Sequence, residues 1–489
     1  MNRTRSAAFA TSAFASLALA GCMPGGEIPS ASAPITQSEA KQGAEYHPQL
    51  LAEFGGTYDG PQAAYVESVG KNIAVQSGLG NARSDFTVSL LNSPVNNAFA
   101  IPGGYVYSTR QLVALMNNEA ELAAVLGHEV GHVAARHSQR RQSEAQKNTL
   151  LGGGLAILSS ILLGDSGIGN TLTRGFLQGS QLLTLKFSRT QELQADELGI
   201  QYLTRAGYDP RAMGTVLTSL AAQNALDAQL QGRDARMPEW ASTHPDPASR
   251  VQSALTKAAG GTGQTNADVF LTRIDGITYG DDPKQGVIEG NTFIHPEMRL
   301  SFSAPQGFYM VNGTRAVTIQ GQSGKAQLTL APYNGNLDSY IRSVFTALGG
   351  EQQQLAPSSI QRTTVNGIPA AYGQARVNNG NSQVDVVVFA YEFSKDRAYH
   401  FTAITQAGGA GAFTPMFNSM RRITASEAAQ VVPRRIQVVT VRSGDTVASL
   451  SRRMAYDTAQ ETRFRVLNGL GSNDTLRAGQ KVKLVIKGA

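Results

Sequence analysis

The pentapeptide His128-Glu129-Val130-Gly131-His132 contains the residues of this chain best suited to chemistry. On a helix, histidines four residues apart project from one face, and two imidazoles so placed can bind the same zinc ion. Glu129 is rotated by one residue, so its carboxylate can reach a water on the metal without being a ligand. The pattern predicts a hydrolytic Zn2+ site in which His128 and His132 are ligands and Glu129 is the general base.

The flanking residues predict the helix that this motif needs. Asn118 and Glu121 form a capping pair, and apolar residues then recur at helical spacing. Gly127 and Gly131 each cost about 0.5–1 kcal/mol against alanine inside a helix. Because they share a face, we expect another stretch of backbone to pack closely there. His137, nine residues after the first histidine, falls on the opposite side and is not expected to be a ligand.

A hydrolytic zinc site needs a third protein ligand and an open position. With a single cysteine in the chain, that ligand must be His, Asp or Glu. A capping box opens at Ser188, so a helix should begin there, and Glu192 and Asp196 share one face of it. We expect Glu192 to bind the metal and Asp196 to accept the ring N–H of a ligating histidine, His128 by preference. The spacing alone leaves open Glu197 as the ligand, or an ordinary solvated acidic face.

The two motifs, HEVGHVAARH and, about sixty residues later, SRTQELQAD, resemble the metallopeptidase family of the CAAX prenyl proteases and the heat-shock protease HtpX. The resemblance is closest to the soluble periplasmic branch that serves outer-membrane quality control. It extends over residues 46–257 and implies a mainly α-helical zincin (α+β) peptidase domain with one Zn2+ per chain. It also implies a metalloendopeptidase of the gluzincin type.

A third block, Asn97-Ala98-Phe99-Ala100 followed by IPGGYVY, indicates by itself a hairpin or the edge of a sheet. In the family that it resembles, this is the edge strand beside the zinc. The unpaired N–H and C=O groups of such a strand can hydrogen-bond an extended substrate backbone. The resemblance therefore implies that Asn97, Ala98, Phe99 and Ala100 bind substrate.

A fourth block, STHPDPASR around His244, also matches a pattern of the family. In periplasmic relatives this histidine lies on a loop near the metal, where it can occupy the open position and hold the enzyme inactive. In this chain, His244 or a tyrosine is also a candidate to stabilise the oxyanion. The alternative is a Ser/Thr/Pro turn that opens a helix and leaves His244 exposed. His47, His295 and His400 have no partner pattern, so no role is assigned to them.

The N-terminus predicts export and anchorage. Two arginines precede an apolar run over residues 7–20, too short to span a bilayer, and Leu-Ala-Gly then precedes Cys22. The arrangement resembles a bacterial lipobox, which implies a signal peptide over residues 1–22 and an acylated Cys22; an ordinary cleaved signal is the alternative. Residues 23–45 have the composition of a flexible tether. No aspartate follows Cys22, which by the enterobacterial sorting rule favours a periplasmic protein anchored to the outer membrane.

Between the first two motifs, residues 150–163 are apolar and a glycine-rich stretch follows. Fourteen residues are short for a membrane span, which needs about 20. We therefore expect a helical hairpin that covers the cleft and packs inside the protein rather than against a membrane.

Two further units are expected in the C-terminal half. Residues 258–286 have the composition of a linker, with an extended connection over 268–284. Strands such as Val384–Phe389 and a helix near Leu337–Leu348 predict an α+β sandwich over residues 287–425, which faintly resembles PsbP-like modules. Because this segment carries no catalytic constellation, we expect it to be a scaffold or a protein-binding surface.

Residues 434–489 hold eleven Lys and Arg against four Asp and Glu. Their strand, GDT turn and leucine-asparagine segment resemble a LysM-like βααβ module, which implies binding to the glycan chains of peptidoglycan. A generic basic docking module, drawn to anionic wall or lipid surfaces, is the alternative. Nucleic acid is not expected as a partner of an exported lipoprotein.

Composition sets the outer bounds. The chain has 489 residues, of which 41% are hydrophobic, enough for about three domains and too many for wholesale disorder. The sequence thus predicts a multidomain, zinc-dependent endopeptidase of the bacterial envelope that cleaves misfolded or stalled envelope proteins. Two alternatives remain, a chaperone or wall-binding scaffold with a latent zinc site, and a hydrolase of peptidoglycan cross-links. The 34-residue periodicity of the repeat domain in periplasmic relatives is not found here.

Overall fold

The computed structural model describes residues 33–79, 82–141, 187–231, 244, 247–349, 355–379 and 382–488. Cys22 and residues 150–163 lie outside these ranges, so the lipid anchor and the cleft-covering hairpin stay predictions. Among the described helices, none combines the length and the apolar character needed to cross a membrane.

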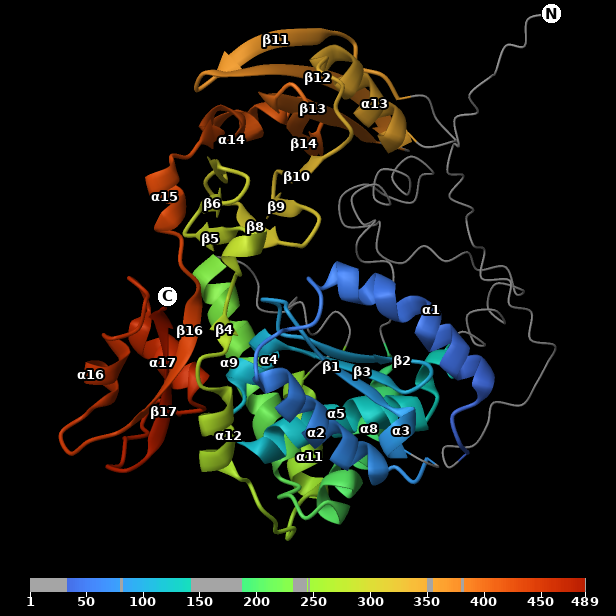
Figure 1. Ribbon diagram of the computed structural model, residues 1–489, viewed down its shortest axis with the longest axis vertical. Helices are drawn as coiled ribbons and strands as arrows, with labels where there is room; N and C mark the ends of the chain where they lie inside the picture. The colour runs from blue at the N-terminus through green and yellow to red at the C-terminus, as the bar shows by residue number, and fades with distance from the viewer. Residues whose placement is uncertain are drawn as a thin grey trace, which may run out of the picture.

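The N-terminal unit (residues 33–257) is built around a small sheet with the strand order β1–β3–β2. β1 (Thr87–Leu91) runs parallel to β3 (Tyr105–Thr109), and β2 (Ala98–Ile101) runs antiparallel to β3. Helix α1 (Gln37–Glu53) packs on one face of the sheet, and two other helices cover the opposite face (Figure 1). In the described chain β2 pairs on one side only, so the predicted edge strand is an edge strand in the structure.

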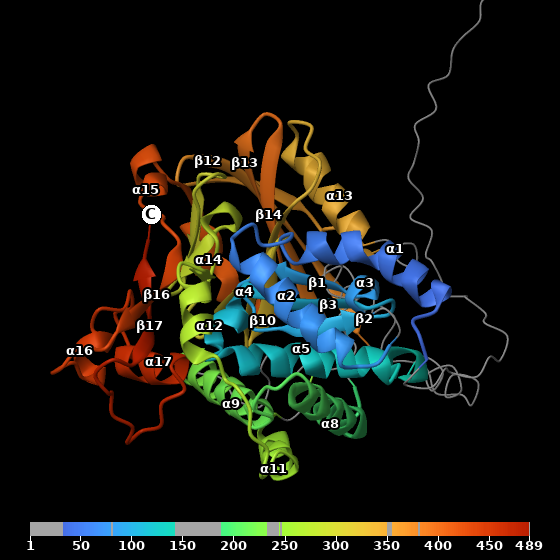
Figure 2. The same cartoon turned by 60° about the horizontal axis from the view of Figure 1, so that its bottom comes forward.

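The helix with the HEVGH motif lies at the centre of this unit. α2 (Gln62–Val75) and α5 (Glu119–Ala134) lie under the sheet. On the far side of α5 follow α8 (Arg189–Arg205), α9 (Ala212–Gln231) and α11 (Pro247–Lys257) (Figure 2). Apolar side chains of α2, α5, α8 and α9 join in one hydrophobic core. The described part of the unit also contains two short helices, α3 (Ala82–Asp85) and α4 (Arg110–Leu115).

The structure corrects the tether predicted over residues 23–45, because α1 begins within that range. Thr36 and Glu39 form a capping box at the start of this helix. Gly43 packs against the turn after β2, where a Cβ would lie 2.3 Å from the carbonyl oxygen of Pro102. Local capping and tertiary packing thus override a composition typical of linkers.

The extended connection predicted over residues 268–284 is also wrong in its first part. The segment begins with the helix α12 (Ala267–Ile274), which buries Phe270 and Ile274 in the core of the N-terminal unit. These apolar residues recur at helical spacing, and the core gives them a surface to pack against.

Residues 287–425 form two antiparallel sheets. Their strands are β5 (Val287–Glu289), β6 (Thr292–His295), β7 (Leu300–Ser303), β8 (Tyr309–Asn312), β9 (Val317–Gly321), β10 (Gly324–Leu330), β11 (Ile360–Val365), β12 (Ile368–Asn379), β13 (Ser382–Ser394), β14 (Arg397–Gln406) and β15 (Arg421–Arg422). The larger sheet has the order β11-β12-β13-β14-β10-β9-β8, and the smaller has the order β15-β7-β6-β5.

The larger sheet is covered on both faces, which explains the continuous apolar run in β13. Val386 and Val388 pack under α13 (Leu337–Gly349), and Val387 and Phe389 face the smaller sheet and α14 (Thr414–Ser419). The predicted helix and the α+β class of this segment are confirmed. The PsbP-like resemblance stays a prediction.

The C-terminal module has the predicted βααβ order. β16 (Arg434–Thr440) pairs antiparallel with β17 (Lys481–Lys487), and α16 (Val447–Ser451) and α17 (Gln460–Leu467) lie between them in sequence. β16 also pairs with β4 (Thr278–Tyr279). Apolar residues of the module belong to the same core as α5. The module is therefore packed into the N-terminal unit, with α15 (Ala425–Ala429) leading into it.

Candidate metal centre

α5 begins as predicted and lies very close to α8. Asn118 caps it, and the Asn118 side chain accepts a hydrogen bond of 2.9 Å from the backbone N–H of Glu121. A Cβ on Gly131 would lie 3.1 Å from the Ala195 carbonyl oxygen of α8, and Gly127 faces α8 in the same way. The two glycines therefore allow the carboxylates of α8 to reach the histidines of α5.

α8 carries the predicted carboxylates on its buried face. Ser188 caps it through the predicted capping box. Glu192 and Asp196 are buried against α5. The side chain of Glu197 is 54% exposed and pairs with Lys257. Glu197, which the spacing left open as a ligand, thus points away from the centre.

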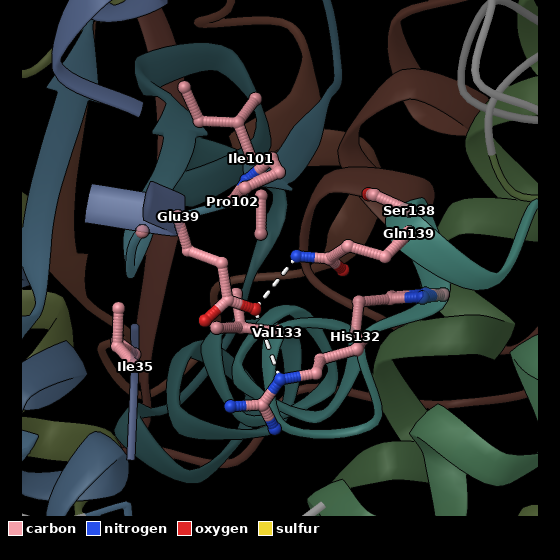
Figure 3. A pocket seen from close by; sticks show the side chains of 11 residues that line it. Ile35, Glu39, Ile101, Pro102, His132, Val133, Ser138 and Gln139 are labelled. Atoms are coloured by element: carbon pink, nitrogen blue, oxygen red, sulfur yellow. Dashed lines mark hydrogen bonds and ion pairs between the residues drawn. The ribbon is translucent and has the colours of Figure 1, made fainter. Parts of the chain in front are cut away.

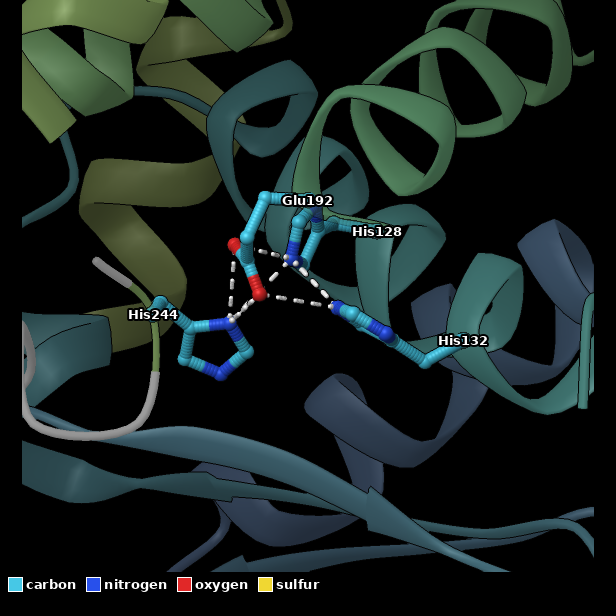
Figure 4. Close-up of side chains that lie close together, drawn as sticks. All are labelled: His128, His132, Glu192 and His244. Atoms are coloured by element: carbon cyan, nitrogen blue, oxygen red, sulfur yellow. Dashed lines mark hydrogen bonds and ion pairs between the residues drawn. The ribbon is translucent and has the colours of Figure 1, made fainter. Parts of the chain in front are cut away.

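Four side chains converge at the centre: His128, His132, Glu192 and His244 (Figure 4). One potential ligand atom from each lies within 4.8 Å of the others. His128 Nε2 is 3.0 Å from His132 Nε2 and 3.5 Å from Glu192 Oε2. His132 Nε2 is 3.5 Å from Glu192 Oε1. Tetrahedral ligands at zinc distances of about 2.0–2.1 Å lie roughly 3.3 Å from one another, so the first three donors match a zinc site.

The outer nitrogens of both motif histidines have partners that direct the inner nitrogens at the centre. His128 Nδ1 lies 2.9 Å from Asp196 Oδ1, to which it donates. His137 Nε2 donates to Gln194 Oε1 at 3.0 Å, so His137 Nδ1 accepts from His132 Nδ1 at 2.8 Å. Both Nε2 atoms then present lone pairs, and at 3.0 Å these repel unless a positive charge lies between them. The donor set fits a metal cation.

The carboxylates around the centre favour a positive charge at His128, which either a proton or a metal cation can supply. Burial lowers the pKa of His128, but hydrogen bonds to Asp196 and Glu192 outweigh it and raise this pKa to about 9. Burial lowers the pKa of His132 well below its usual value. Burial raises the pKa of Glu192, but the imidazoles around it outweigh this and hold it well below its usual range. Glu192 therefore remains anionic, as a metal ligand must be.

Glu129 lies beside the cluster rather than in it, as predicted. It is 1% exposed, its Oε1 lies 3.4 Å from His244 Nε2, and its Oε2 accepts no hydrogen bond from the described residues. Burial raises the pKa of Glu129 above its usual value. A buried carboxylate with an unsatisfied oxygen beside a metal centre is suited to taking a proton from water.

His244 is buried at the centre, so the exposed turn considered as an alternative is wrong. Its Nδ1 lies 3.1 Å from Glu192 Oε1 and 3.3 Å from His128 Nε2. Its Nε2 donates to the carbonyl oxygen of Ala98 in β2 at 3.2 Å. One ring therefore connects the ligand cluster to the edge strand.

Along the four residues of the predicted substrate strand, the backbone N–H and C=O groups point alternately toward β3 and away from it. The backbone N–H of Asn97 donates to Thr109 Oγ1 at the end of β3, and Phe99 pairs with β3. The Ala98 carbonyl instead faces His244, so Ala98 and, two residues on, Ala100 direct their backbone groups away from β3. These outward groups lie on the side of the metal centre.

Arg250 is a site residue that the sequence did not predict. It is 1% exposed on the first turn of α11. Its Nε and Nη2 donate to the two oxygens of Asp196 at 2.8 and 2.5 Å, and its Nη1 donates to Glu192 Oε2 at 2.5 Å. Burial raises the pKa of Asp196, but the hydrogen bonds from Arg250 and His128 outweigh this and lower it to about 2. The sequence signal for this residue was its charge, because Arg250 is the one Lys or Arg in the STHPDPASR block.

His137 occupies a place that helical periodicity did not predict. α5 ends at Ala134, and Arg136 then adopts a left-handed φ of 51°. This turns the chain back and brings His137, which is buried, against His132. No glycine or proline marks the end of α5 in the sequence, so the sequence analysis extended the helix as far as His137. The position of His137 on the opposite side of the helix was therefore wrong.

Comparisons with known proteins agree with this geometry. Residues 61–258 match the family described as Peptidase family M48, and residues 439–485 match the LysM domain. The beta-barrel assembly-enhancing protease of Yersinia pestis is 33% identical over 236 residues, 47% of this chain and 46% of that protein. The same-named protein of Escherichia coli K12 is 32% identical over 232 residues, again 47% and 46%.

A more distant relative comes from mitochondria. The mitochondrial metalloendopeptidase OMA1 of Schizosaccharomyces pombe is 30% identical over 218 residues, 44% of this chain and 59% of that protein. The chain spans about half the length of the curated relatives it matches. The family matches thus confirm the predicted resemblances to a metallopeptidase family and to LysM modules. The segment over residues 61–258 is similar in sequence to the M48 metallopeptidases, and it contains the four residues that could hold a metal ion.

Proposed function

We propose that this protein is a zinc-dependent endopeptidase of the bacterial envelope that cleaves misfolded or stalled envelope proteins. The observation that carries the proposal is the buried convergence of two imidazoles and Glu192, with Glu129 beside them. The names of the bacterial relatives, proteases that enhance β-barrel assembly, support the substrate class. The resemblance of the peptidase segment to the CAAX prenyl proteases and HtpX is part of the same proposal.

In this proposal His128, His132 and Glu192 hold one Zn2+. When bound there, zinc supplies Lewis acidity toward the scissile carbonyl and lowers the pKa of a water toward about 7. Glu129 takes a proton from the attacking water and later delivers it to the leaving amine. Asp196 keeps His128 in the tautomer whose Nε2 faces the centre.

The outward backbone groups of Ala98 and Ala100 are the proposed binding edge for substrate. An extended peptide that adds to β2 pairs its own N–H and C=O groups with them and lies across the metal centre. Folded proteins have few unpaired extended segments to offer. This requirement supports a preference for misfolded or unassembled chains.

His244 is proposed to gate the site. Its Nδ1 lies among the potential ligand atoms, and its Nε2–H is bonded to the Ala98 carbonyl that a substrate N–H would use. Substrate must therefore displace this ring from two positions at once. His244→Ala should raise casein cleavage severalfold; lower cleavage would instead support a role in oxyanion stabilisation and contradict gating.

Acylation of Cys22 and wall binding by the LysM-like module are proposed to hold the enzyme in the periplasm, between a membrane and peptidoglycan. The outer membrane is preferred because no aspartate follows Cys22. The LysM match at residues 439–485 supports the glycan partner.

Cleavage of casein by the full-length protein tests the peptidase. Cleavage should stop with a chelator and return with zinc, and Glu129→Gln should lower it by about 100-fold or more without loss of zinc. Glu197→Gln is the matched control and should cleave normally. Undiminished cleavage by the Glu129 variant would refute the assignment. Release of muropeptides from purified sacculi without casein cleavage would favour the cross-link hydrolase, and zinc binding without either activity would favour the scaffold.

A further inference from the structure

The N-terminal segment Ala33–Glu39 is fastened to the end of α5. Arg136, just beyond that helix, is 2% exposed, and its Nη2 donates to the carbonyl oxygens of Ala33 and Pro34, each at 2.9 Å. Its Nε donates to Glu39 Oε1 at 3.0 Å. A buried guanidinium bonded to three acceptors of one short segment fixes the position of that segment.

Neighbouring residues strengthen this attachment. Gln139 Nε2 donates to Glu39 Oε1 at 2.8 Å. In the turn after β2, a Cβ on Gly103 would lie 2.6 Å from the Glu39 carbonyl oxygen, and one on Gly104 would lie 2.8 Å from Ile35 Cδ1. Both glycines have positive φ, so this turn requires them in any case. The segment is held between the end of α5 and the end of the edge strand.

The fastened segment borders the metal centre. Ile35 and Glu39 line one pocket together with His132 and with residues 100–103 of the edge strand and its turn (Figure 3). The described chain therefore begins beside a proposed metal ligand and beside the proposed substrate-binding edge.

The number of residues between Cys22 and Ala33 limits how far the start of the described chain can lie from a lipid on Cys22. Eleven peptide steps separate Cys22 from Ala33. A fully extended chain spans at most about 3.6 Å per residue, so Ala33 lies within about 40 Å of an acylated Cys22. The LysM-like module lies on the other side of the molecule from α1 (Figures 1 and 2). An acyl group on Cys22 would therefore hold the pocket beside Arg136, rather than the LysM-like module, near a membrane.

We propose that the lipid anchor and Arg136 together hold the substrate-binding edge close to the bilayer, so that the preferred substrates are extended polypeptide segments at a lipid surface. This inference rests on the proposed peptidase function and on acylation of Cys22. The short connection raises the effective concentration of membrane-bound substrate at the cleft, whereas a soluble chain gains nothing from it.

The test uses the full-length acylated protein in vesicles of phosphatidylethanolamine and phosphatidylglycerol. Its substrates share one cleavable extended segment, attached to a lipid by a short or a long spacer, or left without a lipid. The wild type should cleave the short-spacer substrate about tenfold faster than the soluble one. A Gly-Ser insertion of about forty residues after Ile28 should move the preference to the long spacer. Equal rates for all three substrates, or an unchanged preference after insertion, would overturn the inference.

Two further variants separate the possible failures. Cys22→Ser should cleave all three substrates at the soluble rate; if it cleaves none, the peptidase function itself fails. A Cys22 found without an acyl group by mass spectrometry overturns the anchor and this inference with it. Arg136→Gln should speed hydrogen exchange in residues 33–39 and weaken the spacer preference, whereas Arg140→Gln, on the same turn, should change neither. An Arg136 variant with the wild-type preference would contradict the role given to this residue.

Discussion

At the metal centre, each motif histidine is oriented by a different partner. Asp196, itself held by Arg250, bonds to the outer nitrogen of His128. His137 does the same for His132 and is in turn bonded to Gln194. Such outer partners set the tautomer and the direction of a ligating ring. They make His137 a positioning residue for His132, a proposed metal ligand.

His137→Ala should therefore weaken zinc binding by about 10–100-fold, the usual effect of losing an outer-shell partner. His132 would keep its place in α5 but lose the acceptor that fixes its Nδ1 proton. Competition with a chromophoric chelator measures the affinity. His47→Ala, which removes a ring bonded to Tyr107 instead, is the control and should bind zinc normally. Wild-type affinity in the His137 variant would exclude the positioning role.

Among the site residues, the sequence predicted those whose positions depend on local spacing. His128, His132 and Glu129 follow from one helical turn. A capping box predicted the helix that carries Glu192, but the spacing left open whether Glu192 or Glu197 faces the centre. The place of His137 depends on where α5 ends, and the place of Arg250 depends on how α11 packs beside α8. Helical spacing determines neither.

At the scale of elements, the edge strand is the feature that connects the fold to the proposed binding of substrate. Ala100 directs its backbone N–H away from β3, on the side where the Ala98 carbonyl meets His244. Proline is tolerated in edge strands at such positions, since no ladder hydrogen bond is lost.

Ala100→Pro should raise the KM for casein about fivefold, because one backbone hydrogen bond to substrate contributes about 1 kcal/mol. Zinc content and Tm should stay at wild-type values. Ala100→Ser keeps the N–H group and should keep the KM. If Ala100→Pro cleaves casein with an unchanged KM, substrate does not pair with this strand.

The element pair α13 and β14 contains a pH-sensitive group. His400 is 3% exposed, and its Nδ1 lies 2.8 Å from the Tyr340 hydroxyl. Burial lowers the pKa of His400 from 6.5 to about 4. Between these values the unfolded chain binds a proton that the folded chain does not, so stability falls as the pH falls from 6.5 to 4, by roughly 3 kcal/mol in total.

Hydrogen exchange of the β14 amides at pH 7 and pH 4.5 measures this effect. Acidification should destabilise β14 more in the wild type than in His400→Gln, whose amide can still accept from Tyr340. An identical acid response in the two proteins would mean that His400 is not the group responsible.

Element boundaries were predicted well where caps are present and poorly where packing decides. Asn118 and Ser188 begin α5 and α8 as predicted. Residues 37–45 and 267–274 have linker-like or short apolar sequences, yet both are helical because they pack on the N-terminal unit. Composition contains no information about that surface.

At the scale of the whole molecule, the LysM-like module is docked through a buried lysine. Lys483 Nζ donates to the carbonyl oxygens of Ala114, Leu115 and Met116 at 2.9, 3.1 and 2.6 Å. These carbonyls belong to the end of α4, where backbone acceptors lack helical partners. Asn118, the cap of α5, lies two residues after Met116, so the module supports the start of the helix that carries the proposed metal ligands.

Lys483→Met should lower the free energy of unfolding by about 2–4 kcal/mol, because it leaves buried carbonyl groups without donors. The N-terminal unit and the module should melt together at a lower Tm in calorimetry, since they share one core. Lys487→Met removes an exposed cation from the same strand and should leave the Tm unchanged. A wild-type Tm in the Lys483 variant would contradict the docking role. The βααβ module itself was predictable from its motifs, but its docking was not, because it depends on surfaces far apart in sequence.

Zinc content is the measurement that tests the metal centre most directly. Elemental analysis of the purified full-length protein should give one zinc per chain in the wild type, in Glu129→Gln and in Glu197→Gln. Glu192→Ala should lose the metal, because it removes the one carboxylate among the converging donors. A wild-type protein without zinc, or a Glu192→Ala protein with a full equivalent, would show that these side chains do not form the centre described.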